Sequence, residues 1–204
     1  MLTTAMYPSL ILPWSPHPSE AERRYRDAGL VKTKGTLFLL PPSNNVLRET
    51  FNAPPRPKTR MSSGAVALCK HFERGGASSE HGRLHPFWTL PTGSNEDKTN
   101  TASQILEDML AHAIWKNVML LHHGVAVYEM RNSLGFGLRW TLDLDAKSPS
   151  EETDEKRDDL DKEWTIARTT FRGFLEPIAE MAHERPSANQ EKSQDEEDAV
   201  LETF

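Results

Sequence analysis

The chain has 204 residues, a formal net charge of −6 and a hydrophobic share of 37%, below the ~45–50% that is typical of compact domains. This length and composition fit one folded domain with polar extensions better than two large cores. A helical membrane span is excluded because the longest apolar runs, such as Leu37–Leu40 and Val118–Leu121, fall far short of roughly 20 residues.

The cysteine content and the N-terminal sequence favour an intracellular protein. The single cysteine, Cys69, cannot form a disulfide within the chain and gives no support for an oxidising compartment. The first residues lack a basic n-region, and Pro8 and Pro13 interrupt their apolar stretch, which is untypical of a signal peptide. We therefore expect a location in the cytoplasm or nucleus and no membrane partner.

The charge is distributed unevenly along the chain. Residues 1–144 hold 16 Lys/Arg and 12 Asp/Glu, whereas residues 145–204 hold 8 and 18. The acidic part is either an arm that binds a basic partner or a solvated linker and tail. We favour the second interpretation and predict a disordered acidic tail over residues 181–204.

The N-terminal region is predicted to hold short helices. Residues 1–18 form an irregular segment with several prolines, and a single domain follows over residues 19–180. Ser19 and Ser43 are suited to cap helices over Glu20–Leu30 and Asn44–Phe51. The apolar run at residues 36–40 is a possible strand, and Pro41-Pro42 ends it.

The middle of the chain alternates loops and helices. Residues 53–60 read as an extended basic, proline-rich connector, with an SH3-type ligand as the alternative. A helix is expected from Ser62 or Ser63 to about Phe72. Several glycines and prolines indicate a long loop over residues 73–100, whose Phe87-Trp88 pair should pack on the core.

The most regular helix is expected over residues 101–116, capped by Asn100 or Thr101. One apolar stripe marks it, at helical spacing. The residues of this stripe are Ile105, Leu106, Met109, Leu110, Ala113 and Ile114.

A β-hairpin is predicted from strands at residues 125–131 and 136–144. In the second strand the apolar residues alternate with polar ones from Phe136 to Leu144, which is the pattern of a strand with one buried face. A four-residue turn over Asn132–Gly135 sets the expected register. That register pairs Val127 with Trp140, Val125 with Leu142, and Tyr128 with Arg139.

A third strand is expected over residues 169–176, after an acidic linker or short helix at 145–163. Phe171 and Leu175 would share one face of this strand, with Phe174 on the other face. The fold class is therefore α+β: a small antiparallel sheet packed against the helix at residues 101–116, with short N-terminal helices and disordered termini.

Candidate chemistry is sparse, because no spacing matches a metal module, a phosphate-binding loop or a nucleophile motif. His122 and His123 are the candidates for a general base. Arg139 and Arg172 could clamp an anion, although pairing with neighbouring strand residues is the plainer explanation. Tyr128 and Glu176 complete the candidate ligand-binding set, and no metal or cofactor is expected.

Two classes of function stay open. We favour a non-catalytic binding or adaptor protein with a protein partner, since the chain has long polar extensions and lacks a catalytic motif. The alternative is a small enzyme or small-molecule binder with a pocket between the sheet and the loop at residues 73–100. A nucleic-acid partner is not expected, because no recognition signature is present and the acidic last third would repel a polyanion. The oligomeric state stays open.

Overall fold

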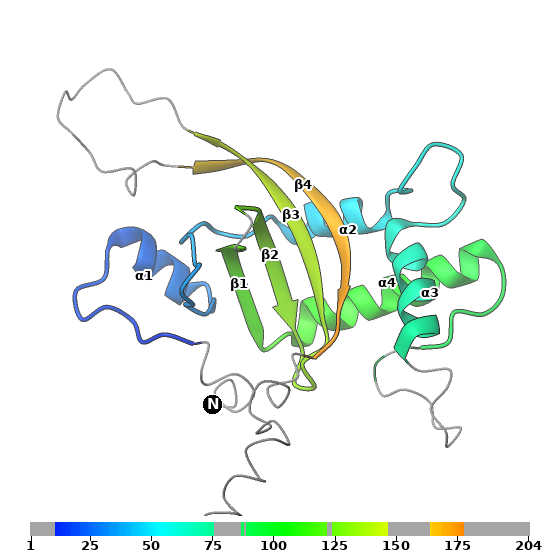
Figure 1. The fold of residues 1–204 in the computed structure, drawn as a ribbon, viewed down its shortest axis with the longest axis horizontal. Coiled ribbons are helices and arrows are strands. Elements are labelled where there is room, and N and C mark those ends of the chain that lie inside the picture. The colour runs from blue at the N-terminus through cyan, green and yellow to red at the C-terminus, as the bar shows by residue number, and fades with distance from the viewer. Residues whose placement is uncertain (1–10, 76–86, 88, 122–123, 147–163, 178–204) are drawn as a thin grey trace, which may run out of the picture.

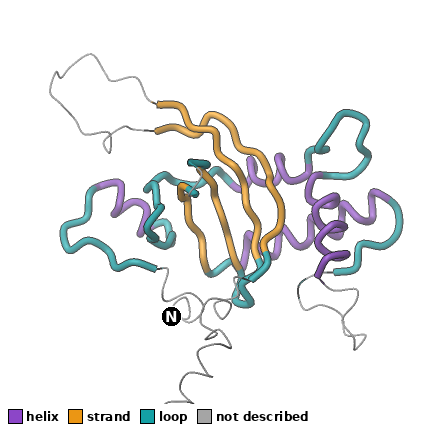
Figure 2. Tube along the Cα trace, viewed as in Figure 1, coloured by secondary structure: helices purple, strands orange, loops and turns teal. Residues whose placement is uncertain are grey.

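The computed structural model describes residues 11–75, 87, 89–121, 124–146 and 164–177. Within these residues four helices precede four strands (Figures 1 and 2), which confirms the α+β class. The helices are α1 (Glu20–Asp27), α2 (Asn44–Asn52), α3 (Ser63–Gly75) and α4 (Asn95–His112). The strands are β1 (Trp115–Leu120), β2 (Ala126–Arg131), β3 (Gly137–Ala146) and β4 (Trp164–Leu175).

The strands form one antiparallel sheet in the order β1-β2-β3-β4. In Figure 1, α2 and α4 lie behind the sheet, α1 lies beside β1, and α3 stands near β4. The far ends of β3 and β4 continue beyond β1 and β2 as a two-stranded ribbon, which ends at Ala146 and Trp164. Among the described elements, helices therefore cover one broad face of the sheet and leave the other face uncovered.

The core lies between the sheet and α2, α3 and α4. Trp140 of β3 is 0% exposed, and its Nε1 donates a hydrogen bond to Thr50 Oγ1 at 3.1 Å. Its ring packs edge-on against Phe171 of β4, with the centroids 5.3 Å apart. From α4, the residues at i, i+3, i+4 and i+7 are buried, as expected of one helical stripe; they are Ala102, Ile105, Leu106 and Met109.

The segment before α2 is attached to the outer edge of β1. Leu37 N donates to Val118 O at 3.0 Å, and Leu120 N donates to Gly35 O at 2.8 Å. The possible strand at residues 36–40 amounts to one isolated bridge, between Thr36 and Met119. These contacts occupy backbone groups that an edge strand would otherwise leave unpaired.

The helix predicted at residues 101–116 begins and ends earlier than expected. Ser94 accepts a hydrogen bond from Asp97 N, and the Asp97 carboxylate accepts one from Ser94 N, so a capping box starts α4 at Asn95. Its last residue is His112, and Trp115 already belongs to β1. The apolar stripe that was extended to Ile114 therefore crosses a helix-to-strand junction, which periodicity alone did not resolve.

The predicted hairpin forms, but its register is wrong by one residue. Phe136 O accepts from Asn132 N at 2.9 Å, so the loop has three residues and not four. Gly135, with φ +85°, supplies the left-handed position that such a loop requires. Tyr128 therefore pairs with Trp140, and Glu129 pairs with Arg139.

The third predicted strand starts five residues earlier than expected, at Trp164, and it contains an irregularity. The register shifts between Arg139 and Trp140, where their partners are Gly173 and Phe171. Arg172 is the extra residue of this β-bulge, and Gly173 has φ +147°. Phe171 and Phe174 are consequently both buried on the core side, whereas strict alternation had separated them.

The acidic linker from residue 147 onwards and the tail at 181–204 lie outside the described residues. None of the described helices is long and apolar enough to cross a membrane.

Candidate functional site

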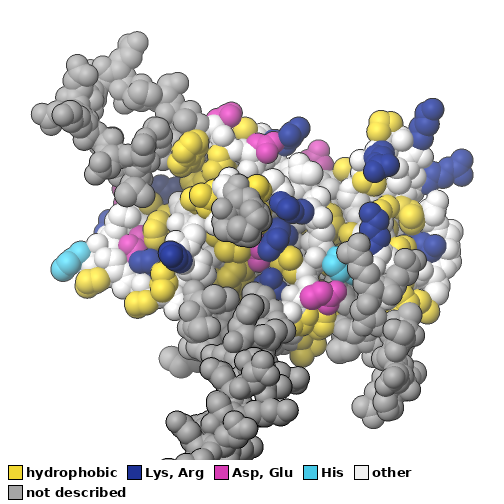
Figure 3. Space-filling view, in the orientation of Figure 1, with side chains coloured by type: hydrophobic (Ala, Val, Ile, Leu, Met, Phe, Trp, Pro, Cys, Tyr) yellow, Lys and Arg dark blue, Asp and Glu magenta, His cyan; other side chains and the backbone are white. Residues whose placement is uncertain are grey.

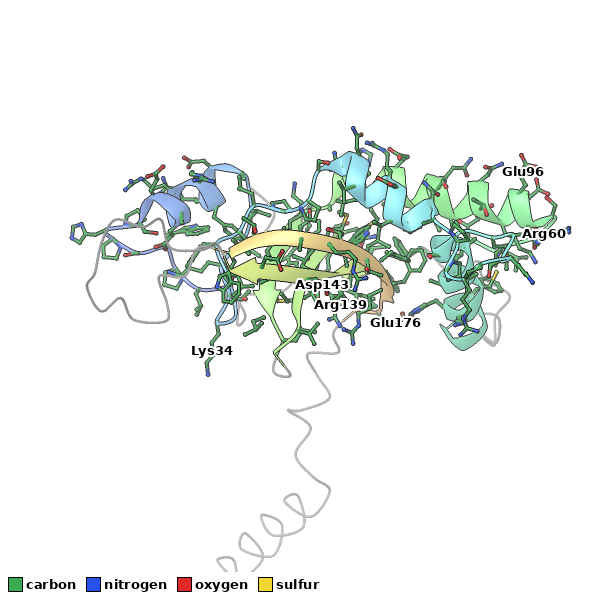
Figure 4. All side chains as sticks on the ribbon, turned by 90° about the horizontal axis from the view of Figure 1, so that it is seen from above. Lys34, Arg60, Glu96, Arg139, Asp143 and Glu176 are labelled. Atoms are coloured by element: carbon green, nitrogen blue, oxygen red, sulfur yellow. The ribbon has the colours of Figure 1, made fainter. Side chains whose placement is uncertain are left out.

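The helix-free face of the sheet carries a group of charged side chains. Figure 4 shows Arg139, Asp143 and Glu176 on the side of the sheet away from α2 and α4. In Figure 3, where this side faces the viewer, basic side chains lie beside acidic ones over the strands. The alternation of β2 and β3 produces this separation, because Tyr128 and Trp140 point to the core while Glu129 and Arg139 point away from it.

Glu129, Arg131 and Arg139 form one compact cluster, here called the Glu129 cluster. Glu129 Oε1 accepts a hydrogen bond from Arg139 Nε at 2.5 Å and pairs with Nη2 of the same guanidinium. Its Oε2 lies 3.5 Å from Arg131 Nη2. The side chain of Glu129 is only 2% exposed, whereas that of Arg139 is 24% exposed. Arg139 thus covers the carboxylate and can still be reached from solvent.

Arg131 connects this cluster to the ends of two other elements. Its Nη1 donates to Gly135 O at 2.7 Å and to Glu176 O at 3.0 Å. The side chain of Glu176 accepts in turn from His71 of α3, with Nδ1 and Oε1 3.1 Å apart. Residues of α3, β2 and β3 and of the segment after β4 are therefore joined in one network.

A buried hydrogen-bond donor lies beside this network. Trp115 is the register partner of Arg131 on β1 and is 6% exposed. Its Nε1 has no hydrogen-bond partner among the described residues. Buried donors of this kind are usually met by ordered water, so this indole N–H does not by itself indicate a ligand.

A second ion pair lies on the same face but differs in exposure. Arg168 Nε of β4 and Asp143 Oδ2 of β3 are 2.7 Å apart, and their side chains are 75% and 49% exposed. Exposed pairs of this kind contribute little to stability. The Asp143–Arg168 pair therefore provides a matched comparison for the enclosed Glu129 cluster.

The structure brings together only some of the predicted site residues. Arg139 belongs to the Glu129 cluster, and Glu176 joins it through the backbone bond to Arg131. Tyr128 lies on the opposite, helix-covered face, where it is 3% exposed and its pKa is raised by burial. The expected pairing of Tyr128 with Arg139 is wrong because it depended on the four-residue turn.

The remaining candidates do not join this network in the described structure. Arg172 is exposed at the bulge of β4, and no ion pair joins it to another described residue. His122 and His123 lie outside the described residues, so their role as general bases stays a hypothesis from the sequence. The described side chains also contain no group of three or more His, Cys, Asp or Glu that could hold a metal ion.

A cleft of about 420 Å³ lies near the place where the sequence predicted a pocket. It is bounded by α4, the β2–β3 turn and the segment around Phe87, whose ring stacks on Phe136 with centroids 4.9 Å apart. The predicted site residues Arg139, Tyr128, Arg172 and Glu176 do not line it. The cleft and the Glu129 cluster are therefore separate features of the described structure.

Sequence reasoning did not select Glu129, Arg131 or His71 as site residues. Glu129 and Arg139 are ten residues apart, and the hairpin register alone brings them together. With a three-residue loop assumed, the alternation would have placed both on the polar face. No signal in the sequence would have linked His71 to the sheet, because that contact depends on where β4 ends.

The comparison with protein families favours one of the two open classes of function, the enzyme. Residues 52–147 match the family model of the CdiA C-terminal tRNase toxin domain. The match starts at the last residue of α2, ends just after β3, and includes the whole Glu129 cluster. No curated protein and no solved structure matches the chain.

This match corrects three predictions. A non-catalytic binding or adaptor protein is the wrong class, because the matching domain is a nuclease. Protein binding is accordingly wrong as the main description. The exclusion of a nucleic-acid partner is also wrong, because the matching domain is a tRNase and tRNA is a nucleic acid. That exclusion relied on the acidic residues after position 144, nearly all of which lie beyond the matched segment.

Proposed function

We propose that this chain is a ribonuclease that cleaves tRNA and that the Glu129 cluster is its active centre. The observation that carries the proposal is a nearly enclosed carboxylate held by two arginines on the helix-free face of the sheet. The three residues of this cluster lie within the segment that resembles a tRNase toxin domain. Since tRNA functions in the cytoplasm, the proposal fits an intracellular site of action and gives no support to a nuclear one.

The residue types suit RNA cleavage by the neighbouring 2′-hydroxyl. A carboxylate can accept the 2′-OH proton as a general base. Guanidinium groups bind phosphate oxygens through paired hydrogen bonds and stabilise the charge that develops on them. Glu129 and Arg139 supply these two functions side by side, which also agrees with the predicted anion clamp at Arg139.

Substrate binding would also expose the base. Arg139 is hydrogen-bonded to Glu129 in the free protein, and its guanidinium remains accessible. A phosphodiester competes with the carboxylate for the same donors, because both are oxyanions that match the guanidinium fork. Transfer of Arg139 to the phosphate would leave Glu129 Oε1 available to the 2′-hydroxyl.

The direct test is incubation of the full chain with total tRNA, followed by denaturing electrophoresis. Wild type is expected to release tRNA fragments, and Glu129→Gln is expected to be at least about 100-fold slower, as for a lost general base. Asp143→Asn is the matched control, since it removes a carboxylate from an exposed ion pair on the same face. Equal cleavage by all three proteins would exclude the Glu129 cluster, and no cleavage by wild type would exclude the activity.

A further inference from the structure

The proposed reaction needs a second group that Glu129 does not provide. When the 2′-oxygen attacks phosphorus, the bond between phosphorus and the 5′-oxygen breaks, and that oxygen leaves as an alkoxide unless it is protonated. Arginine cannot serve here because it stays protonated at ordinary pH. A group that can give up a proton near neutral pH is required, and histidine is the side chain suited to this.

His71 is the histidine that the described structure connects to the Glu129 cluster. It lies on α3, and its side chain is 18% exposed. Its Nδ1 is 3.1 Å from Glu176 Oε1, while the carbonyl of Glu176 accepts from Arg131 at 3.0 Å. Arg131 in turn lies beside Glu129. One residue, Glu176, thus contacts both the imidazole and an arginine of the Glu129 cluster.

Two neighbours of His71, the carboxylate of Glu176 and the ring of Phe174, hold its imidazole in place. The carboxylate of Glu176 lies 3.1 Å from Nδ1 and holds the imidazole ring in one orientation. Phe174 of β4 packs edge-on against the imidazole, with centroids 5.9 Å apart. The guanidinium of Arg131 donates to the backbone carbonyl of the same Glu176. The two other helices that pack against α3 are α2 and α4. Their described ion pair joins Arg48 of α2 to Glu107 of α4.

We infer that His71 is the general acid of the proposed ribonuclease and that Glu176 is its positioning residue; this inference rests on the proposed function. The 2′-oxygen forms a bond to phosphorus as its proton passes to Glu129. The bond from phosphorus to the 5′-oxygen breaks, and that oxygen takes a proton from the His71 imidazolium. The products are a 2′,3′-cyclic phosphate and a 5′-hydroxyl end.

The test compares two leaving groups in the same tRNA. After the cleavage position is mapped, the tRNA is ligated from two synthetic halves with either oxygen or sulfur as the bridging 5′ atom. A thiolate leaves without prior protonation, because a thiol is far more acidic than an alcohol. A defect in the general acid therefore appears with the oxygen substrate and disappears with the sulfur substrate.

The variants are His71→Gln, Glu176→Gln and the control His112→Gln. His112 also pairs with a carboxylate, that of Asp108 at 2.9 Å, but it lies on the exposed side of α4. His71→Gln is expected to lose about 100-fold or more with the oxygen substrate and less than about 10-fold with the sulfur substrate. Glu176→Gln should show the same pattern with a smaller loss, and His112→Gln should cleave both substrates as wild type does.

The outcomes separate the two proposals. Equal losses on both substrates by His71→Gln, or no loss on either, would overturn the role of His71 while wild-type cleavage still supports the ribonuclease. If wild type cleaves neither substrate, the proposed function fails and the role of His71 fails with it. The variant His122→Ala/His123→Ala belongs in the same assay, because selective loss on the oxygen substrate there would assign the acid to those residues.

Discussion

Glu129 and Arg139 are direct partners across the β2–β3 hairpin, and their side chains are hydrogen-bonded on the helix-free face. A three-residue loop creates this relationship, because a one-residue change in register turns every side chain of a strand to the opposite face. With the four-residue loop, Arg139 would face Tyr128, and Glu129 would have no basic partner opposite it. The local geometry at Gly135 thus determines the composition of the proposed site.

Replacing Arg139 by lysine should separate the contribution of its positive charge to tRNA cleavage from that of its planar guanidinium. Lysine keeps the positive charge but lacks the planar fork that binds two oxygens at once. One lost charge-assisted hydrogen bond is worth about 1.5–3 kcal/mol, so Arg139→Lys should cleave tRNA about 10- to 100-fold more slowly. The measurement is the cleavage rate at saturating tRNA, with Arg168→Lys at the exposed pair as the control. Equal rates for the two variants would show that Arg139 does not bind the phosphate.

Expression of the chain in a growing cell should slow growth if it destroys tRNA. Wild type is expected to inhibit growth on induction, and Glu129→Gln is expected to relieve the inhibition at equal protein level. Asp143→Asn should remain inhibitory, because it alters only the exposed pair. Growth curves with northern analysis of tRNA check this expectation. Inhibition by Glu129→Gln with intact tRNA would point to a cause other than cleavage.

The N-terminal arm, the described residues 11–43 before α2, should make stability depend on pH through Glu22. The backbone N–H of Ser15 and the ammonium of Lys32 hold the pKa of the Glu22 carboxyl below its ordinary value of 4.5. A lowered folded-state pKa stabilises the protein above the unfolded pKa, and this contribution is lost as the pH falls through the folded pKa. Glu22→Gln should therefore be less stable than wild type at pH 7, with the difference shrinking below about pH 4.5.

Urea unfolding at several pH values measures this effect. The control is Glu20→Gln, which changes an exposed acid in the same first turn of α1. A constant difference between Glu22→Gln and wild type from pH 7 to pH 3 would show that the ionised carboxylate is not responsible.

Tyr25 should stabilise the attachment of the arm to β1. Its hydroxyl, buried at 0% exposure, donates to Asn117 Oδ1 at 2.6 Å and accepts from Val118 N at 2.5 Å. Burial also raises the pKa of this phenol, so it stays neutral across the working range. Tyr25→Phe leaves the buried Val118 N without its acceptor and removes one of two hydrogen bonds to Asn117 Oδ1, which still accepts from Thr36 Oγ1. The change should cost about 1–3 kcal/mol. An unchanged urea midpoint would show that water replaces the hydroxyl.

The sequence predicts the fold more securely than the site, for physical reasons that particular residues illustrate. The alternation from Phe136 to Leu144 locates β3 and its buried face, because burial acts on every second residue. The sequence places the start of α4 too late, because the capping box of Ser94 with Asp97 precedes the apolar stripe by a full turn or more. The bulge at Arg172 was equally hidden, because it depends on the pairing with β3.

The proposed site is harder to predict because its residues come from separate elements with no fixed spacing. Arg139 and Arg172 are candidates from the sequence because both lie on predicted strands and not in charge runs. Glu129 was visible on the same predicted sheet, yet the expected register did not place it opposite Arg139. His71 reaches the network through Glu176, a contact made only once α3 and β4 are packed together.

The most direct measurement of the central claim is a single-turnover cleavage assay with one purified tRNA, end-labelled so that the chemistry of both new ends is determined. The account predicts that wild type yields a 2′,3′-cyclic phosphate and a 5′-hydroxyl, and that Glu129→Gln is slower by about 100-fold or more. Full cleavage by Glu129→Gln, or tRNA left intact by wild type at protein excess, would contradict it.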